Sequence, residues 1–156
     1  MPQLPEERFK QRIAKEKELV REYLPTFKII RESSFGIVLR GTIDAPPDSI
    51  YAGEKFDVEI ELGRNFPFSP PVIKWWTPTW HPNIAPPDRA PPYPVCISTL
   101  STKWVPTMYM PAIVEALRAM LSTPNPRSPL NSAAAQQLLY DPETYRATVK
   151  RYMMKV

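Results

Sequence analysis

The sequence is poor in cysteine and histidine, with one residue of each type among 156. A single cysteine cannot form a disulfide within the chain, and this favours a reducing compartment, so we expect a cytoplasmic protein. One histidine and one cysteine also fall short of the four nitrogen and sulfur ligands of a typical zinc site. The composition therefore excludes a disulfide scaffold and a zinc-ribbon type of domain.

Long apolar runs and strong charge excess are missing as well. No run of about 18 apolar residues occurs, and residues 1–4 lead directly into charges, so we expect neither a membrane span nor a secretory signal. The formal net charge is +4, from 20 basic and 16 acidic residues. This modest excess does not favour nucleic-acid binding. We expect a soluble monomer.

Glycine is scarce too, with 4 residues against 21 prolines. Proline restricts the backbone, so this ratio favours stiff loops over flexible ones. A length of 156 residues fits one domain with its own core.

The hydrophobic spacing predicts a single α+β domain over residues 5–153. A first amphipathic helix begins near Pro5 and stops at Pro25, and further helices are predicted from Pro111 to about 121, over 132–139 and over 142–153. Four short β-rich runs lie between the first two helices, at residues 27–32, 35–43, 55–62 and 71–76. The predicted order is an N-terminal helix, a four-stranded antiparallel meander, a long active-site loop and C-terminal helices.

The third β-rich run shows the clearest alternation. Its apolar and acidic side chains alternate as Phe56, Asp57, Val58, Glu59, Ile60, Glu61 and Leu62. Because neighbouring side chains of a strand point to opposite faces, this pattern predicts one buried face and one solvated face.

About thirty residues after Trp76 lack periodicity and contain His81, Asn83 and Cys96. Cys96 fits either a nucleophile or a small buried residue. His81 fits either the base of a Cys-His pair or a structural side chain in a turn stiffened by Pro82, and we favour the structural role. Asn83 can either donate to an oxyanion or satisfy its own turn.

Residues 6–21 concentrate six basic side chains on the first helix, including Arg8, Arg12 and Lys15. Taken alone, such a run is typical of a solvated helix face.

An ordered set of motifs runs through the chain. It consists of Tyr51-x-Gly53-x-x-Phe56, FPFSPP at 66–71, HPNI at 81–84, Cys96, Trp104-x-Pro106 and PNPxxPLN at 124–131. This set resembles the ubiquitin-conjugating enzyme family, and the match covers almost the whole chain.

The resemblance implies that Cys96 accepts ubiquitin or a ubiquitin-like protein from an activating enzyme as a thioester and passes it to a substrate lysine. Asn83 would steady the oxyanion or the surrounding loop, while His81 and Pro82 would be structural. No metal or small-molecule cofactor is implied. The remaining site residues are the RING-type ligase contacts Pro67, Phe68, Pro106 and Thr107, and the activating-enzyme contacts Arg8, Arg12 and Lys15.

Three features depart from the family pattern, and the first is that Ile97-Ser98 follows Cys96 where Leu-Asp is frequent. The spacer from Asn83 to Cys96 is longer than usual because of a proline-rich insert at 85–94. Ser128 stands where many members carry an acid near the incoming lysine, and Asp88 of the insert is an alternative source of that carboxylate. Two other classes fit less well. A non-catalytic scaffold of the same fold lacks the cysteine, and a Cys-His hydrolase needs a more strongly activated thiol.

Overall fold

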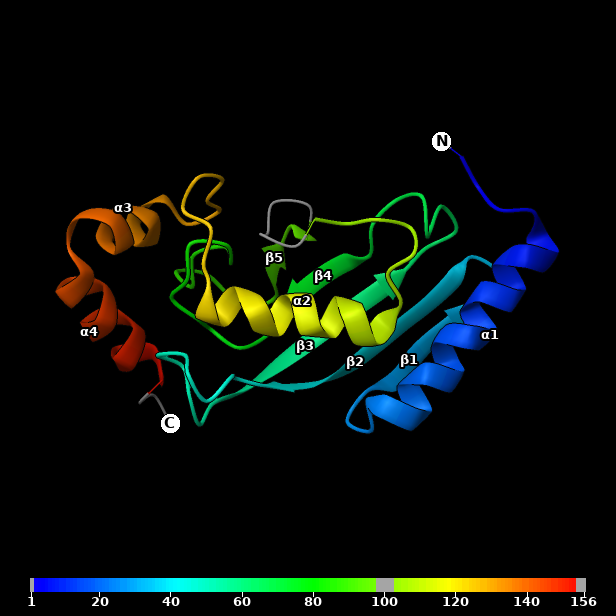
Figure 1. Ribbon diagram of the computed structural model, residues 1–156, viewed down its shortest axis with the longest axis horizontal. Coiled ribbons are helices and arrows are strands. Elements are labelled where there is room, and N and C mark those ends of the chain that lie inside the picture. The colour runs from blue at the N-terminus through cyan, green and yellow to red at the C-terminus, as the bar shows by residue number, and fades with distance from the viewer. Residues whose placement is uncertain (1, 98–102, 154–156) are drawn as a thin grey trace.

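The centre of the fold is an antiparallel sheet, in which the residues that the structure describes form five strands side by side in the order β1-β2-β3-β4-β5 (Figure 1). The coordinates are a computed structural model that describes residues 2–97 and 103–153. The strands are β1 (Lys28–Ser33), β2 (Gly36–Asp44), β3 (Lys55–Leu62), β4 (Val72–Trp75) and β5 (Tyr93–Val95). The sheet and its flanking helices confirm the predicted α+β class.

The described residues form four helices beside the sheet, and the bounds of these helices agree with the proline and asparagine signals in the sequence. They are α1 (Glu6–Tyr23), α2 (Met110–Ser122), α3 (Ser132–Tyr140) and α4 (Pro142–Met153). Pro111 lies in the first turn of α2, and the Asn131 side chain caps α3 by accepting from the Ala134 N–H. In Figure 1, α2 crosses one face of the sheet, α1 lies beside one end of α2, and α3 and α4 lie at its other end.

Helix α2 carries much of the core because one broad face of it is apolar. Ile113, Leu117 and Met120 are buried there, and Trp75 of β4 is also fully buried in the same cluster. Burial of one large apolar side chain contributes about 1.5–3 kcal/mol to stability relative to exposure. This buried cluster is therefore a main source of stability. None of the helices in the part of the chain that the structure describes has the length and apolarity to cross a membrane.

The prediction of four strands was wrong by one, because the long loop contains β5. This strand is three residues long and pairs with β4, with Trp75 opposite Tyr93 and Ile73 opposite Val95. Pro94 hides it from pattern analysis, since proline lacks the N–H that a central strand needs. The strand sits at the edge of the sheet, where the carbonyl of Pro94 still accepts from the Ala85 N–H at 3.1 Å.

The acidic face of β3 is less solvated than its alternation predicted. Glu59 is only 8% exposed, although the apolar residues between the acids are buried as expected. Glu59 lies opposite Arg40 of β2 and Lys74 of β4, and its carboxylate is 3.8 Å from the Lys74 ammonium. Long basic side chains on both neighbouring strands therefore cover this acid.

Candidate active site

Cys96 follows β5 directly, and the alternation of that strand sets its exposure. Val95 and Ile97 are buried on either side of it, whereas Cys96 itself is exposed. Because Val95 is paired with Ile73 of β4, the sheet fixes the point at which the thiol reaches the surface. A thiol held in this way is accessible to a large partner while its backbone is anchored in the core.

His81 is fully buried, and both ring nitrogens are engaged. Nδ1 accepts from the Asn83 N–H at 2.9 Å, so the proton is on Nε2, which donates to the Met120 carbonyl at 2.6 Å. Burial lowers the pKa of His81 to about 4, although the bond to Met120 acts in the opposite direction. This geometry supports the structural interpretation of His81 and argues against a general base.

Asn83 is buried and forms a two-point pair with the backbone of Asn125. Its Nδ2 donates to the Asn125 carbonyl at 2.8 Å, and its Oδ1 accepts from the Asn125 N–H at 2.8 Å. An amide that both donates and accepts holds a backbone unit more firmly than a single bond does. Asn83 therefore fixes the start of the segment 124–131 next to the turn that contains His81.

A second attachment joins the same turn to the far end of that segment. The carbonyl of Pro82 accepts from the N–H groups of Leu130 and Asn131 at 2.8 and 3.0 Å. Ser128 lies between the two attachments and is exposed. The segment is thus a bridge with fixed ends that presents Ser128 to solvent.

The residue before His81 ties the turn to the last two helices. Trp80 donates from Nε1 to Oε1 of Gln137 on α3 at 2.8 Å, and its ring stacks on Tyr152 of α4 with 6.1 Å between centroids. The Trp80 carbonyl also accepts from the hydroxyl of Tyr51, which bonds to the Tyr145 hydroxyl of α4 at 2.9 Å. Sequence analysis missed these contacts.

The two tyrosine hydroxyls of this network stay protonated because they are buried. Burial raises the pKa of Tyr145 to about 12, and the pKa of Tyr51 is raised well above its ordinary value for the same reason. The pair therefore contributes hydrogen bonds and not charge. Tyr51 opens a turn whose Gly53 has a φ of +93°, a conformation that favours glycine.

Comparison with known proteins agrees with this geometry. The family model described as "Ubiquitin-conjugating enzyme" matches residues 12–153. The chain belongs to the ubiquitin-conjugating enzyme family. It is 36% identical over 113 residues to ubiquitin-conjugating enzyme E2-20 kDa of Schizosaccharomyces pombe, covering 72% of this chain and 61% of that protein.

Two further relatives show the same extent of similarity. Human ubiquitin-conjugating enzyme E2 K is 32% identical over 112 residues, which is 72% of this chain and 54% of the human protein. Ubiquitin-conjugating enzyme E2-22 kDa of Drosophila melanogaster is 32% identical over 114 residues, which is 73% of this chain and 55% of the fly protein. The chain thus spans little more than half of the length of these two relatives.

In this member of the family, a groove of about 410 Å³ lies between α1 and two loops. Its lining includes the sequence-predicted docking residues Arg8, Arg12, Lys15, Pro67, Phe68, Pro106 and Thr107. The structure therefore brings both predicted docking sets to one surface. Phe68 is 42% exposed despite its apolar ring, while Pro67 is buried and shapes the loop.

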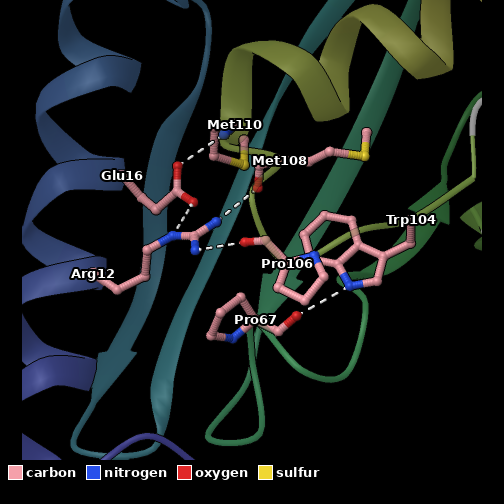
Figure 2. A network of polar contacts seen from close by, with 7 residues as sticks. All are labelled: Arg12, Glu16, Pro67, Trp104, Pro106, Met108 and Met110. Carbon is pink, nitrogen blue, oxygen red and sulfur yellow. Dashed lines mark hydrogen bonds and ion pairs between the residues drawn. The ribbon is translucent and has the colours of Figure 1, made fainter.

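The basic residues of α1 differ in their exposure. Arg8 and Lys15 are exposed, whereas the Arg12 side chain is only 9% exposed. The Arg12 guanidinium bonds to Glu16 and to the carbonyls of Pro106 and Met108 (Figure 2). Arg8 and Lys15 thus present their charges to solvent, and Arg12 uses its charge within the protein.

The proline-rich insert 85–94 is closed on itself by one backbone and one side-chain hydrogen bond. The Ala85 N–H donates to the Pro94 carbonyl at its base, and the Tyr93 hydroxyl donates to the Arg89 carbonyl at 2.8 Å. Asp88 and Arg89 are exposed at its tip, where Arg89 Nε lies 3.6 Å from the Asp88 carboxylate. Within residues 2–97 and 103–153, no three His, Cys, Asp or Glu side chains gather as a metal site would require.

Proposed function

We propose that this chain is the catalytic domain of a ubiquitin-conjugating enzyme, spanning residues 5–153 and working as a cytoplasmic monomer. The Cys96 thiolate attacks the thioester carbonyl of ubiquitin or a ubiquitin-like protein on an activating enzyme and releases that enzyme's thiol. A neutral lysine amine of the substrate then attacks the new thioester. An amide bond forms, the amine loses a proton, and the Cys96 thiol is regenerated.

The observation that carries this proposal is the placement of Cys96. A thiol that is exposed between two buried neighbours, at the end of an edge strand, suits covalent attachment of a whole protein and not of a small buried substrate. The turn with His81 and Asn83 supports the same proposal through its attachment to the segment 124–131.

Asn83 and Ser128 receive roles within this reaction. We assign oxyanion stabilisation to the second N–H of the Asn83 amide, because the first donates to Asn125. Ser128 lies on the exposed bridge beside the turn and has no carboxylate with which to accept a proton. Asp88 at the exposed tip of the insert is the alternative acid.

The groove between α1 and the loops supports the assignment of partners. Exposed cations at Arg8 and Lys15 favour an acidic surface on the activating enzyme, and an exposed Phe68 favours an apolar contact with a RING-type ligase. Pro106 and Thr107 are exposed on the neighbouring loop and extend the ligase surface.

The test is a non-reducing gel after incubation with ubiquitin-activating enzyme, ATP and ubiquitin. We expect an adduct that is one ubiquitin larger and disappears when a thiol reductant is added, because free thiols exchange with thioesters. Cys96→Ala should abolish the adduct, and Cys96→Ser should replace it with an oxyester that resists the reductant.

Two outcomes would overturn the proposal. A full-strength adduct on Cys96→Ala would place the modifier elsewhere, and the absence of any adduct with ubiquitin or a ubiquitin-like protein would favour a non-catalytic scaffold. In the same gel, Asn83→Ala should still form the adduct, while its discharge to lysine should slow.

A further inference from the structure

Helix α2 begins without a cap from its own neighbourhood. Tyr109 occupies the N-cap position and makes no side-chain hydrogen bond to the helix. The first turn of any α-helix has N–H groups without partners inside the helix, and Met110, which carries one of them, is fully buried here. A partner for the Met110 N–H has to come from elsewhere in the fold.

That partner is Glu16 of α1, which is fully buried. Its Oε1 accepts from the Met110 N–H at 2.8 Å, a contact between residues 94 positions apart. A carboxylate at this place also suits the partial positive charge of a helix N-terminus. Glu16 therefore caps α2 across the gap between the two helices.

Arg12 lies one turn earlier on α1 and completes the contact (Figure 2). Its Nε donates to Oε2 of Glu16 at 3.0 Å, and its terminal nitrogens donate to the carbonyls of Pro106 and Met108 at 2.8 and 2.7 Å. A guanidinium presents these donors in one rigid fork, which a lysine ammonium cannot reproduce.

Aromatic rings enclose the same guanidinium. It lies 4.8 Å from the centroid of Phe66 and 3.9 Å from that of Tyr109. Trp104 packs against Phe66 with 5.5 Å between the ring centroids. Its Nε1 donates to the Pro67 carbonyl at 3.1 Å, as Figure 2 shows. The loop 104–109 is thus joined to α1 on one side and to the loop 66–68 on the other.

We propose that Arg12 and Glu16 are positioning residues that hold the loop 104–109 on α1, and that Arg12 is not a docking cation. The assignment of a ligase to the loop and of an activating enzyme to α1 rests on the proposed function, whereas the positioning of the loop does not. Pro106 and Thr107 remain exposed, while the carbonyl of Pro106 accepts a hydrogen bond from Arg12 of α1. Arg12 thereby sets where the ligase surface stands relative to the exposed cations of α1.

The deciding variant is the double substitution Arg12→Met with Glu16→Met, which removes the guanidinium donors and the carboxylate acceptor together and leaves the net charge unchanged. The matched control is Arg8→Met, which removes an exposed cation from the same helix. The first measurement is backbone amide hydrogen exchange by NMR, which needs no partner protein. The second is the salt dependence of the KM for ubiquitin-activating enzyme during charging with ubiquitin.

We expect exchange at Met108 and Met110 to accelerate by roughly tenfold or more in the double variant, because the Met110 N–H loses its acceptor and the Met108 carbonyl loses the donor that holds the loop on α1. Leu117, within α2, is the reference amide and should not change. The salt dependence of KM should match wild type. In Arg8→Met, amide exchange at Met108 and Met110 should not change. The KM for ubiquitin-activating enzyme should instead rise roughly twofold to fivefold and depend less on salt.

Conservative variants keep the proposal falsifiable if the double variant folds poorly. Arg12→Lys retains the charge without the fork, so it should accelerate exchange at Met108 as strongly as Arg12→Ala does. The proposal would be overturned if amide exchange at Met108 in Arg12→Lys were the same as in the wild type. It would also be overturned if the KM of the double variant lost salt dependence to the same extent as that of Arg8→Met. If the protein never accepts ubiquitin or a ubiquitin-like protein, the proposed function is wrong. The exchange data would still show whether Arg12 and Glu16 hold the loop.

Discussion

Acidification should destabilise this protein through His81 in particular. The buried imidazole has a pKa of about 4, compared with the ordinary value of 6.5, so protons bind the unfolded chain first as the pH falls. This difference corresponds to about 3 kcal/mol of unfolding free energy, at about 1.36 kcal/mol per pKa unit. That contribution is fully present above pH 6.5 and is lost as the pH falls to about 4.

Urea unfolding between pH 7.5 and 4 measures this loss, with His81→Gln as the comparison. The chain has one histidine, so the difference between the two curves isolates its titration. Glu16 has the opposite effect on the pH dependence of stability, because burial raises the pKa of its carboxyl. Its contribution to the free energy of unfolding therefore falls as the pH rises through this raised pKa. Glu16 is present in both proteins, and its effect cancels in the difference.

We expect His81→Gln to be less stable at pH 7, by about 1–3 kcal/mol, because the Asn83 N–H loses its buried acceptor. The gap should shrink toward pH 4 as the wild type loses its histidine contribution. Parallel curves over the whole range would show that the imidazole is not held neutral, and the argument from its burial and tautomer would then fail.

Two further sets of variants test the proposed reaction. Phe68→Ala should weaken ligase-stimulated transfer and spare charging, whereas charge reversal at Arg8 and Lys15 should weaken charging in a salt-sensitive way; equal loss of both steps in both variants would refute the separation of surfaces. Ser128→Asp should speed single-turnover discharge to free lysine near pH 7 and flatten its rise toward the lysine pKa, which is about 10.4 when unperturbed. If Asp88→Ala slows discharge and Ser128→Asp has no effect, the acid lies in the insert.

Local signals were sufficient to predict the helices and four of the strands. Pro25 and Pro111 mark helix ends, and the alternation over residues 55–62 matches β3 with the same bounds. These features depend on backbone restriction and on side-chain period, which are visible in a short window. The strand β5 escaped because Pro94 within it and Pro92 just before it suppress the ordinary strand signal.

The contacts that hold the candidate site together depend on residues far apart in the chain. Trp80 and Gln137 are 57 positions apart, and no local pattern pairs them. Glu16 is different, because it falls on the stripe of Phe9, Ile13 and Val20 that α1 buries. An acidic residue at a position that is otherwise apolar in a helical repeat indicates a buried polar partner. Here the indication was easy to miss, because Glu16 lies within the run of charged residues 6–21.

The contacts of Trp80 also have a consequence for the order of folding during synthesis. Its ring stacks on Tyr152, and the Tyr51 hydroxyl that reaches its carbonyl also bonds to Tyr145. A ribosome adds about 5–20 residues per second, so the turn with His81 is made several seconds before α4 exists. Until α4 leaves the ribosome, the nascent chain has this turn without its α4 contacts, and a chaperone that covers the indole of Trp80 would protect it.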